Sequence, residues 1–203
     1  MLILIRHGNT FEAGETPVWV GAHTDMPLTM TGEAQAAAAG RYVAQLDRPI
    51  SAIVAGPLKR TQRTAALVAQ GLGKGENAYV IDERLREIGY GQWEGLSGEV
   101  IAQRFGVAML EQWEQHGVWP QGMGWEPSLP HIMAQLEEFL ADMRVRCADG
   151  GIVAVTSNGI LRLLHGLVTA GAADKAAKVK TGHVCLLEPQ PQGWRIAAWN
   201  VKP

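Results

Sequence analysis

The chain has 203 residues, of which 47% are hydrophobic and 19% charged, and its formal net charge is −2. This composition is typical of a folded globular protein and excludes a polar, disordered chain. A nucleic-acid or anionic-membrane partner usually requires a basic face, and the sequence has no Lys/Arg cluster that would supply one. We therefore expect neither nucleic acid nor a membrane among the partners of this protein.

The beginning of the sequence is apolar only as far as Ile5, which is too short for a membrane span and lacks the pattern of an export signal. The two cysteines, Cys147 and Cys185, are not spaced like metal ligands, and two reduced thiols are the simpler interpretation. These features predict a cytoplasmic protein. No repeat or linker divides the sequence, so we expect a single domain over residues 1–203.

In chain order, three segments share one pattern, in which a short apolar run of strand type leads into a tight polar turn. The runs occupy residues 2–5, 51–55 and 151–156, and helical patterns follow the second and the third. Residues 183–188 and 193–199 flank a turn-like segment and are predicted to pair as neighbouring strands. Continuous apolar runs are typical of strands buried on both faces. The sequence therefore predicts an α/β fold, with a mostly parallel central sheet flanked by helices on both faces.

Two further helices are expected between these segments. Residues 31–46 are rich in alanine, with Thr31 as the expected N-cap and Glu33 in the first turn, where the helix dipole favours an acid. Residues 131–147 carry apolar side chains along one side, as an amphipathic helix does.

Residues 106–130 differ from the rest of the chain, because tryptophans stand there among several glycines and prolines. Long segments of this kind are often functional, and we predict a helical or loop insert over roughly residues 97–130. One interpretation is a cap over a site, whose rings would favour an apolar or aromatic leaving group. The other is an insert that packs its own tryptophans, which are Trp113, Trp119 and Trp125.

Polar residues follow the three apolar runs at the positions where a ligand is expected. In open α/β sheets, ligands bind beyond the carboxyl ends of the strands. Arg6 and His7 follow the first run, Arg60 lies just past the second, and Asn158 follows the third. Glycines beside them permit sharp turns and close approach of the backbone to a ligand. These glycines are Gly8, Gly56 and Gly159.

These residue types suggest phosphoryl transfer. Arginine side chains match phosphate oxygens in bidentate fashion and stay charged. A neutral imidazole can attack phosphorus and carry the phosphoryl group, and a carboxylic acid such as Glu87 can protonate the leaving alkoxide. Taken singly, Arg60 also has a simpler interpretation as a solvated charge at a helix start, and Glu87 as a surface acid. Their expected meeting at the strand ends favours the functional interpretation.

Five blocks of the sequence resemble motifs of the histidine phosphatase superfamily, which includes cofactor-dependent phosphoglycerate mutases and many small phosphatases. The first block resembles the Arg-His-Gly-x-Thr signature of that family. The blocks occur in the family's order and span nearly the whole chain, which makes the signal specific. They are LIRHGNT, DMPLTMTGEAQA, GPLKRTQRTA, RLREIGYGQWEG and VTSNGILRLL. The resemblance implies an α/β sheet flanked by helices, with smaller helical inserts over the site.

Position by position, the resemblance implies a role for each residue. His7 would be the nucleophile that becomes phosphohistidine, and Arg6 and Arg60 would hold the phosphoryl oxygens. Glu87 would protonate the leaving group and then act as the base for water. The resemblance also implies that no metal and no organic cofactor is needed, and that the partner is a small phosphorylated substrate. Both a monomer and a homodimer are compatible with it.

The sequence departs from the family at three places. The last of these blocks normally contains Ser-His-Gly in the family, whereas this chain has Ser157-Asn158-Gly159, so Asn158 and Gly159 are the expected phosphate-binding residues there. The replaced histidine normally contacts the phosphoryl group, and an asparagine can donate a hydrogen bond but cannot carry positive charge. Losing one such donor costs roughly 3–4 kcal/mol, part of which a neutral donor should recover. The second departure is Gly56, where the family usually has serine. The third is Ala13, near which many members have an asparagine.

Three other histidines are candidates to replace the missing one. His165 lies two helical turns beyond Asn158, His183 precedes a strand near the C-terminus, and His23 lies in the loop after the first strand. The simpler interpretation, that all three are surface or ordinarily bonded histidines, is preferred.

The predicted function is that of a phosphomonoesterase, which hydrolyses a small phosphorylated metabolite through a phosphohistidine at His7 and is attenuated by Asn158. One alternative is a degenerate member of the family that binds a phosphorylated ligand or a partner without turnover. A second alternative is a phosphoglycerate mutase, which the short chain and the segment GQWEGLSGE disfavour.

Overall fold

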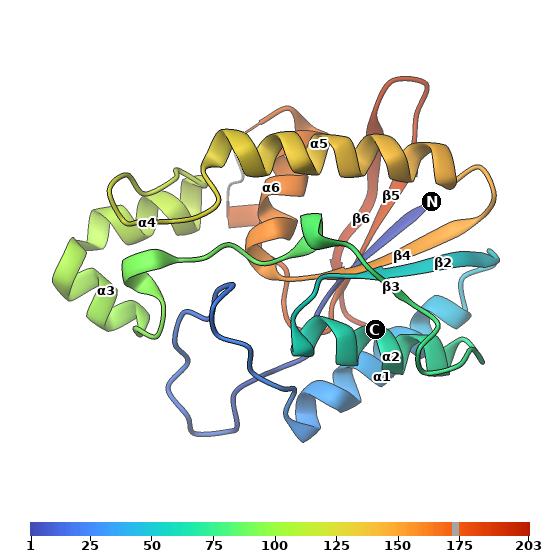
Figure 1. Cartoon of the computed structure of the whole chain (residues 1–203), viewed down its shortest axis with the longest axis horizontal. Coiled ribbons are helices and arrows are strands. Elements are labelled where there is room, and N and C mark those ends of the chain that lie inside the picture. Colours follow the sequence, from blue (N-terminus) through green and yellow to red (C-terminus); the bar gives the residue numbers. More distant parts are fainter. Residues whose placement is uncertain (172–174) are drawn as a thin grey trace.

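The computed structural model describes residues 1–171 and 175–203, and a six-stranded sheet forms the centre of this part of the chain. The strand order is β3-β2-β4-β1-β5-β6 (Figure 1). The first four strands of this order pair in parallel, β5 pairs antiparallel with β1, and β6 pairs antiparallel with β5. The strands are β1 (Leu2–Arg6), β2 (Ile50–Ala55), β3 (Val80–Ile81), β4 (Gly151–Thr156), β5 (Val184–Pro189) and β6 (Trp194–Val201).

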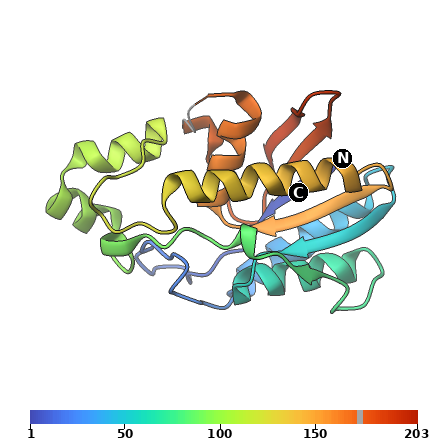
Figure 2. The same ribbon diagram turned by 45° about the horizontal axis from the view of Figure 1, so that its top comes forward.

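Helices cover both faces of the sheet, namely α1 (Met30–Ala44), α2 (Lys59–Gly71), α5 (Leu129–Arg146) and α6 (Asn158–Thr169). Successive side chains of β1 point to opposite faces of the sheet and belong to two separate hydrophobic clusters. Ile3 and Ile5 pack in a cluster with residues of α1 and α2, whereas Leu2 and Leu4 belong to a cluster with residues of α5 and α6. Figure 2 shows α5 and α2 on opposite sides of the sheet. This arrangement confirms the predicted α/β fold.

The helix expected over residues 31–46 is α1, and the prediction of Thr31 as its N-cap is wrong. The N-cap is Thr29, whose hydroxyl oxygen accepts a hydrogen bond from Gly32 N at 3.0 Å. The backbone N–H of Thr29 also donates to Asn9 O at 3.0 Å. Because this contact with a distant part of the chain holds Thr29 in an extended conformation, the helix begins after it and Thr31 falls inside the first turn.

The other predicted elements are present with small shifts at their ends. Helix α5 begins at Leu129 and not at residue 131, because Pro130 fits the first turn of a helix, where no backbone N–H needs a partner. The two predicted C-terminal strands are β5 and β6, and their antiparallel pairing is confirmed.

The segment of residues 97–130 stands off one end of the sheet (Figures 1 and 2). It contains α3 (Gly98–Phe105), α4 (Val107–His116) and the loop that leads to α5. Trp113 and Trp119 each pack edge-on against Trp125, which also packs edge-on against Tyr90 and Trp93. These tryptophans therefore pack the segment together and join it to Tyr90 and Trp93. Because these rings pack against one another, they no longer support the interpretation that tryptophans line the site and favour an apolar leaving group.

A buried arginine holds the segment of residues 97–130 against α6. Arg162 is 2% exposed, and its Nη2 donates to Trp113 O at 2.7 Å and to Glu114 O at 3.1 Å. These carbonyls lie in the last turn of α4, and Trp113 O also accepts from the backbone N–H of Gly117 at 3.0 Å. The C-terminal end of α4 is thereby fixed relative to the sheet.

Both cysteines are buried free thiols. Burial raises the pKa of the Cys185 thiol to about 12, which keeps it protonated at neutral pH. In the part of the chain that the structure describes, no helix combines the length and the apolar character needed to cross a membrane.

Candidate active site

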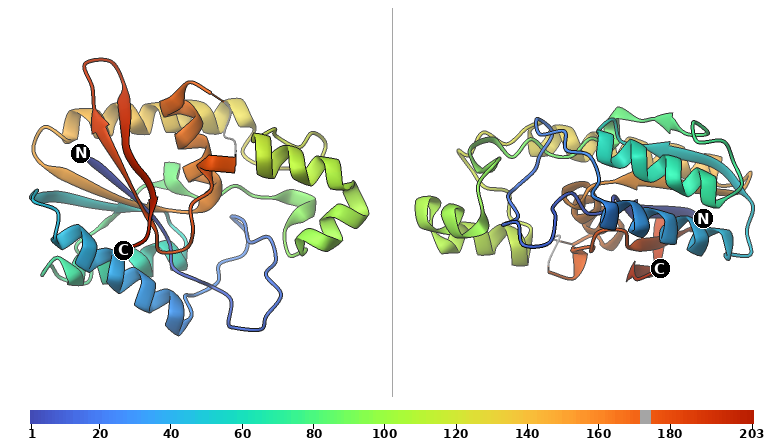
Figure 3. Two further views of the ribbon diagram at one scale, coloured as in Figure 1. Left: turned by 180° about the vertical axis from the view of Figure 1, so that it is seen from behind. Right: turned by 90° about the horizontal axis from the view of Figure 1, so that it is seen from below.

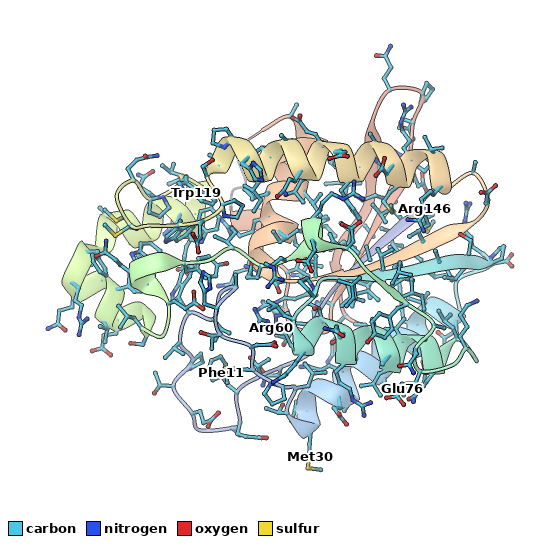
Figure 4. All side chains as sticks on the ribbon, viewed as in Figure 1. Phe11, Met30, Arg60, Glu76, Trp119 and Arg146 are labelled. Atoms are coloured by element: carbon cyan, nitrogen blue, oxygen red, sulfur yellow. The ribbon has the colours of Figure 1, made fainter. Side chains whose placement is uncertain are left out.

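A cavity of about 380 Å³ lies beyond the carboxyl ends of β1 and β4. Five of the side chains predicted for the site line it, and they are Arg6, His7, Arg60, Glu87 and Asn158. The loop after β1 also lines the cavity, and Figure 3 shows this loop on the same side of the sheet as α3 and α4. Figure 4 shows Arg60 near the start of α2, and Phe11 on the loop after β1. The fold thus brings together residues that are distant in the sequence.

His7 is held as a neutral imidazole in a defined tautomer. Its side chain is buried, and Nδ1 lies 2.7 Å from Gly8 O. Because a carbonyl oxygen only accepts hydrogen bonds, Nδ1 carries the proton and Nε2 keeps its lone pair. Burial, and then the charges of Arg60 and Arg6, lower the pKa of His7 well below its usual value of 6.5. At neutral pH the ring is therefore uncharged, and the free lone pair of Nε2 is the form that can attack phosphorus.

Two arginines supply positive charge beside His7. Arg60 is 1% exposed and donates to three carbonyl oxygens of residues 20–24, at 2.8 to 3.5 Å. Arg6 donates from Nη1 to Val179 O at 2.6 Å, and its buried Nε has no hydrogen-bond partner among the described residues. A buried donor without a partner is costly, and an anion in the cavity would satisfy it. Burial lowers the pKa of both guanidinium groups, yet arginine stays protonated at neutral pH.

Glu87 is a buried carboxyl group within the field of both arginines. Its Oε1 accepts from Ile88 N at 2.9 Å, and its Oε2 accepts from Gly159 N at 3.2 Å. Burial raises the pKa of Glu87 above its usual 4.5, while these two N–H groups and the charges of Arg60 and Arg6 oppose the rise. A carboxyl group with a raised pKa is suited to exchange a proton near neutral pH.

Gly159 lies where no side chain fits. A Cβ at this position would lie 2.4 Å from Glu87 Oε1 and 2.6 Å from Tyr90 Oη. Burial and the neighbouring Glu87 raise the pKa of Tyr90 well above 10, so its hydroxyl stays protonated and donates to Glu87. Tyr90 is not among the residues predicted for the site. The available signal was its place in the block RLREIGYGQWEG, three residues after Glu87.

The backbone of Val179 orients both Asn158 and Arg6. Asn158 Oδ1 accepts from Val179 N at 3.0 Å, and Val179 O accepts from Arg6 Nη1 at 2.6 Å. Because a backbone N–H only donates, the amide oxygen of Asn158 must face Val179, and the amide NH₂ group faces away from it. Asn158 lines the cavity, so its amide is a neutral hydrogen-bond donor there.

The other two departures from the family have separate outcomes. A Cβ at Gly56 would lie 2.5 Å from Leu85 O, so this backbone has no room for a serine. Ala13 is exposed in the loop after β1 and is not among the residues that line the cavity.

None of the three alternative histidines is among the described residues that line the cavity. His23 Nε2 lies 2.6 Å from a carboxylate oxygen of Glu126, and His183 Nδ1 lies 3.0 Å from Asn200 O. His165 packs edge-on against an aromatic ring. These ordinary partners support the simpler interpretation of all three.

The outer part of the cavity contains residues that the sequence does not single out. Phe11, Val18 and Trp19 line it from the loop after β1. Lys178 and Glu114 line it as well, and Lys178 Nζ lies 3.9 Å from Glu114 Oε1. All of these residues lie outside the five family blocks, so no motif marks them.

The cavity therefore joins an uncharged imidazole, two fixed cations and a carboxyl group that can hold a proton. Such a set of groups is suited to transfer of a phosphoryl group. Among the described residues, no cluster of three or more His, Cys, Asp or Glu side chains is arranged to bind a metal ion.

Comparison with known proteins identifies the family of this chain. The family model for branch 1 of the histidine phosphatase superfamily matches residues 2–202. A 2,3-bisphosphoglycerate-dependent phosphoglycerate mutase of Methylobacterium radiotolerans is 30% identical over 189 residues, which cover 90% of this chain and 86% of that protein. Two solved structures share the fold. The mycobacterial glucosyl-3-phosphoglycerate phosphatase has a TM-score of 0.80 and 24% identity, covering 100% of this chain and 99% of that one. The alpha-ribazole phosphatase from Shigella flexneri has a TM-score of 0.72 and 23% identity, covering 99% of this chain and 96% of that one. This chain belongs to the histidine phosphatase superfamily.

Proposed function

We propose that this protein is a phosphomonoesterase that hydrolyses a small phosphorylated metabolite through a phosphohistidine at His7. The observation that carries the proposal is the state of His7, a buried neutral imidazole whose Nδ1 proton is bound to Gly8 O. The charges of Arg6 and Arg60 that keep the ring neutral are also the charges that would attract a phosphoryl group.

In the first step, Nε2 of His7 forms a bond to phosphorus while the bond between phosphorus and the leaving oxygen breaks. Arg6 and Arg60 are positioned before substrate binds, so they stabilise the charge on the phosphoryl oxygens without reorganisation. The leaving oxygen takes a proton from Glu87, whose raised pKa keeps the acid form accessible. The products are an alcohol and a phosphohistidine.

In the second step, a water molecule attacks the phosphorus of the phosphohistidine. The Glu87 carboxylate takes a proton from this water, and the electrons of the phosphorus–nitrogen bond return to Nε2 of His7. Phosphate leaves, and both side chains are back in their starting states. The segment of residues 97–130 serves as a cap in this proposal, since its Glu114 lines the cavity.

Asn158 supports reduced activity and not its complete loss. Its amide NH₂ group faces away from Val179, so one hydrogen-bond donor remains available to a phosphoryl oxygen. The positive charge that a histidine would add is missing.

The experiment that tests the proposal measures phosphate release from a panel of phosphomonoesters by the wild-type protein and His7→Ala. We expect release by the wild type and none by the variant. After an acid-free quench, mass spectrometry should find the phosphoryl group on the peptide that contains His7. A urea unfolding curve controls for folding of the variant. A folded His7→Ala variant that is as active as the wild type contradicts the proposal.

The two alternatives give different results in the same experiment. A degenerate binder, which Asn158 motivates, would bind phosphate esters in a manner that depends on Arg6 and Arg60 but release no phosphate. A mutase, which the relative from Methylobacterium radiotolerans motivates, would move the phosphoryl group between the positions of phosphoglycerate, and NMR detects this directly.

A further inference from the structure

We infer that the ion pair between Glu114 and Lys178 makes the outer end of the cavity selective for phosphate esters of uncharged alcohols, and against esters that also carry a carboxylate. The inference rests on the proposed function and names the class of substrate for the same cavity.

The charged residues that line the described part of the cavity fall into two groups by burial. Arg6, Arg60 and Glu87 form the inner group, with two positive charges against one carboxyl group. Lys178 and Glu114 form the outer group, with side chains 59% and 47% exposed. Within the outer group the two charges cancel. The inner end therefore offers net positive charge to one phosphoryl group, and a second anionic group on the substrate meets no net positive charge at the outer end.

The backbones that carry the two charges are fixed on either side of the pair. Glu114 O accepts from Nη2 of the buried Arg162 at 3.1 Å. Lys178 directly precedes Val179, whose N–H and carbonyl groups bind Asn158 and Arg6. The two side chains are partly exposed to solvent, and the hydrogen bonds of the chain beneath each of them keep their charges at the cavity.

The uncharged lining of the cavity fits a carbon skeleton. Phe11, Val18 and Trp19 contribute apolar surface. Trp19 is held in place, because its backbone N–H donates to Leu96 O at 2.9 Å. Its ring also packs edge-on against Tyr90, with the ring centroids 4.9 Å apart. A rigid aromatic ring of this kind offers apolar area at little cost in conformational entropy. An uncharged alcohol with apolar surface therefore suits this lining.

An ester with a carboxylate is disfavoured here for two reasons. Lys178 already has Glu114 as a partner, so a substrate carboxylate has to compete for it. Glu114 also offsets the attraction that Lys178 exerts on that carboxylate, so the outer end offers the carboxylate no net stabilisation. Interactions between exposed charges change an equilibrium by up to about fivefold, so the expected selectivity is modest but measurable.

The test compares two esters with the same skeleton, glycerol 3-phosphate and 3-phosphoglycerate, which differ by a hydroxymethyl group in place of a carboxylate. The measured quantity is the ratio of kcat/KM for 3-phosphoglycerate to that for glycerol 3-phosphate. The proteins are the wild type, Glu114→Gln, Lys178→Gln and the control Glu111→Gln. Glu111 lies on the same helix and is exposed, but it does not line the cavity. General damage to the protein cancels in the ratio.

We expect the wild type to prefer glycerol 3-phosphate. Glu114→Gln should raise the ratio by about two- to fivefold, since it removes the offsetting charge and frees Lys178. Lys178→Gln should lower the ratio, and Glu111→Gln should leave it unchanged. Raising the ionic strength should shrink the effect of Glu114→Gln, because these charges are exposed to solvent.

Calorimetric binding of the same two esters separates this inference from the proposed function. If no ester of the panel is hydrolysed but Glu114→Gln shifts the ratio of the Kd values of these two esters, the hydrolase proposal fails and the charge selectivity stands. If the wild type prefers 3-phosphoglycerate, or if Glu114→Gln and Glu111→Gln behave alike in both measurements, the inference is overturned even if hydrolysis is robust.

Discussion

The orientation of the Asn158 amide allows the isosteric substitution Asn158→Asp to test whether this amide donates a hydrogen bond to the phosphoryl group. Asn158→Asp keeps an oxygen that accepts from Val179 N, a contact of 3.0 Å in the native chain. It replaces the NH₂ group at the cavity with a second oxygen, which cannot donate when ionised. The variant therefore leaves the local packing almost unchanged and removes one function, the donor to the phosphoryl group.

The size of the effect follows from the loss of one preorganised donor, which costs about 2.7–4 kcal/mol, or about 100- to 1000-fold in rate. Repulsion between the new carboxylate and the phosphoryl group adds to this loss, and the nearby Arg6 offsets part of it. Asn158→Ala removes the same donor but also leaves Val179 N without its partner, which should cost about 1–3 kcal/mol of folding stability. Asn158→His should raise activity, because an imidazolium adds the positive charge that the amide lacks, whereas a neutral imidazole would keep only the contact with Val179 N.

The assay is kcat/KM for the best ester of the panel, together with competition by inorganic phosphate and urea unfolding for each variant. We expect Asn158→His to be the most active, followed by the wild type, Asn158→Ala and Asn158→Asp. The unfolding curves should single out Asn158→Ala as the least stable. If Asn158→Asp is as active as the wild type and binds phosphate equally well, the amide does not act as a donor and this account of Asn158 is wrong.

Three further predictions concern the neighbours of Asn158. Gly159→Ala places a Cβ 2.4 Å from Glu87 Oε1; displacing that carboxyl group by about 1 Å should lower kcat/KM about 100-fold, and overpacking should cost about 1–3 kcal/mol in urea unfolding. The usual gain of about 1 kcal/mol for glycine to alanine in a helix would refute this. Glu87→Gln should lower kcat/KM, which reports the first step only, about 100- to 10,000-fold for alkyl esters but much less for p-nitrophenyl phosphate, because nitrophenolate leaves without a proton. Equal losses of kcat/KM for both esters would exclude Glu87 as the acid. Because the pKa of His7 lies well below 6.5 in the folded chain, the unfolded chain binds a proton below that pH that the native chain does not. The free energy of unfolding should therefore decrease as the pH is lowered below 6.5, by up to about 1.4 kcal/mol per pH unit. His7→Gln should lack this contribution when unfolding curves are compared across that range.

Local patterns in the sequence were sufficient for the strands and for the set of side chains at their ends. Continuous apolar runs identify buried strands, and parallel strands present their carboxyl ends at one edge of a sheet. Arg6, His7 and Asn158 follow such runs directly, so their meeting in one cavity follows from the strand pattern. The α1 N-cap shows where local patterns fail, since Thr29 and Thr31 are equally good caps by residue type. The hydrogen bond from Thr29 N to Asn9 O selects the first of them.

The sequence by itself determined the fold class, the family and the residues beyond the strand ends, because each of these is written in short contiguous patterns. Only the tertiary structure decided how those side chains are oriented and which groups surround them. Contacts over long separations turn the Asn158 amide by way of Val179, close the space beside Gly159 with Glu87 and Tyr90, and place Glu114 opposite Lys178. Each of these contacts joins chain segments that carry no common pattern. Their geometry depends on how the helices and loops pack around the sheet, and no single segment of the sequence contains that information.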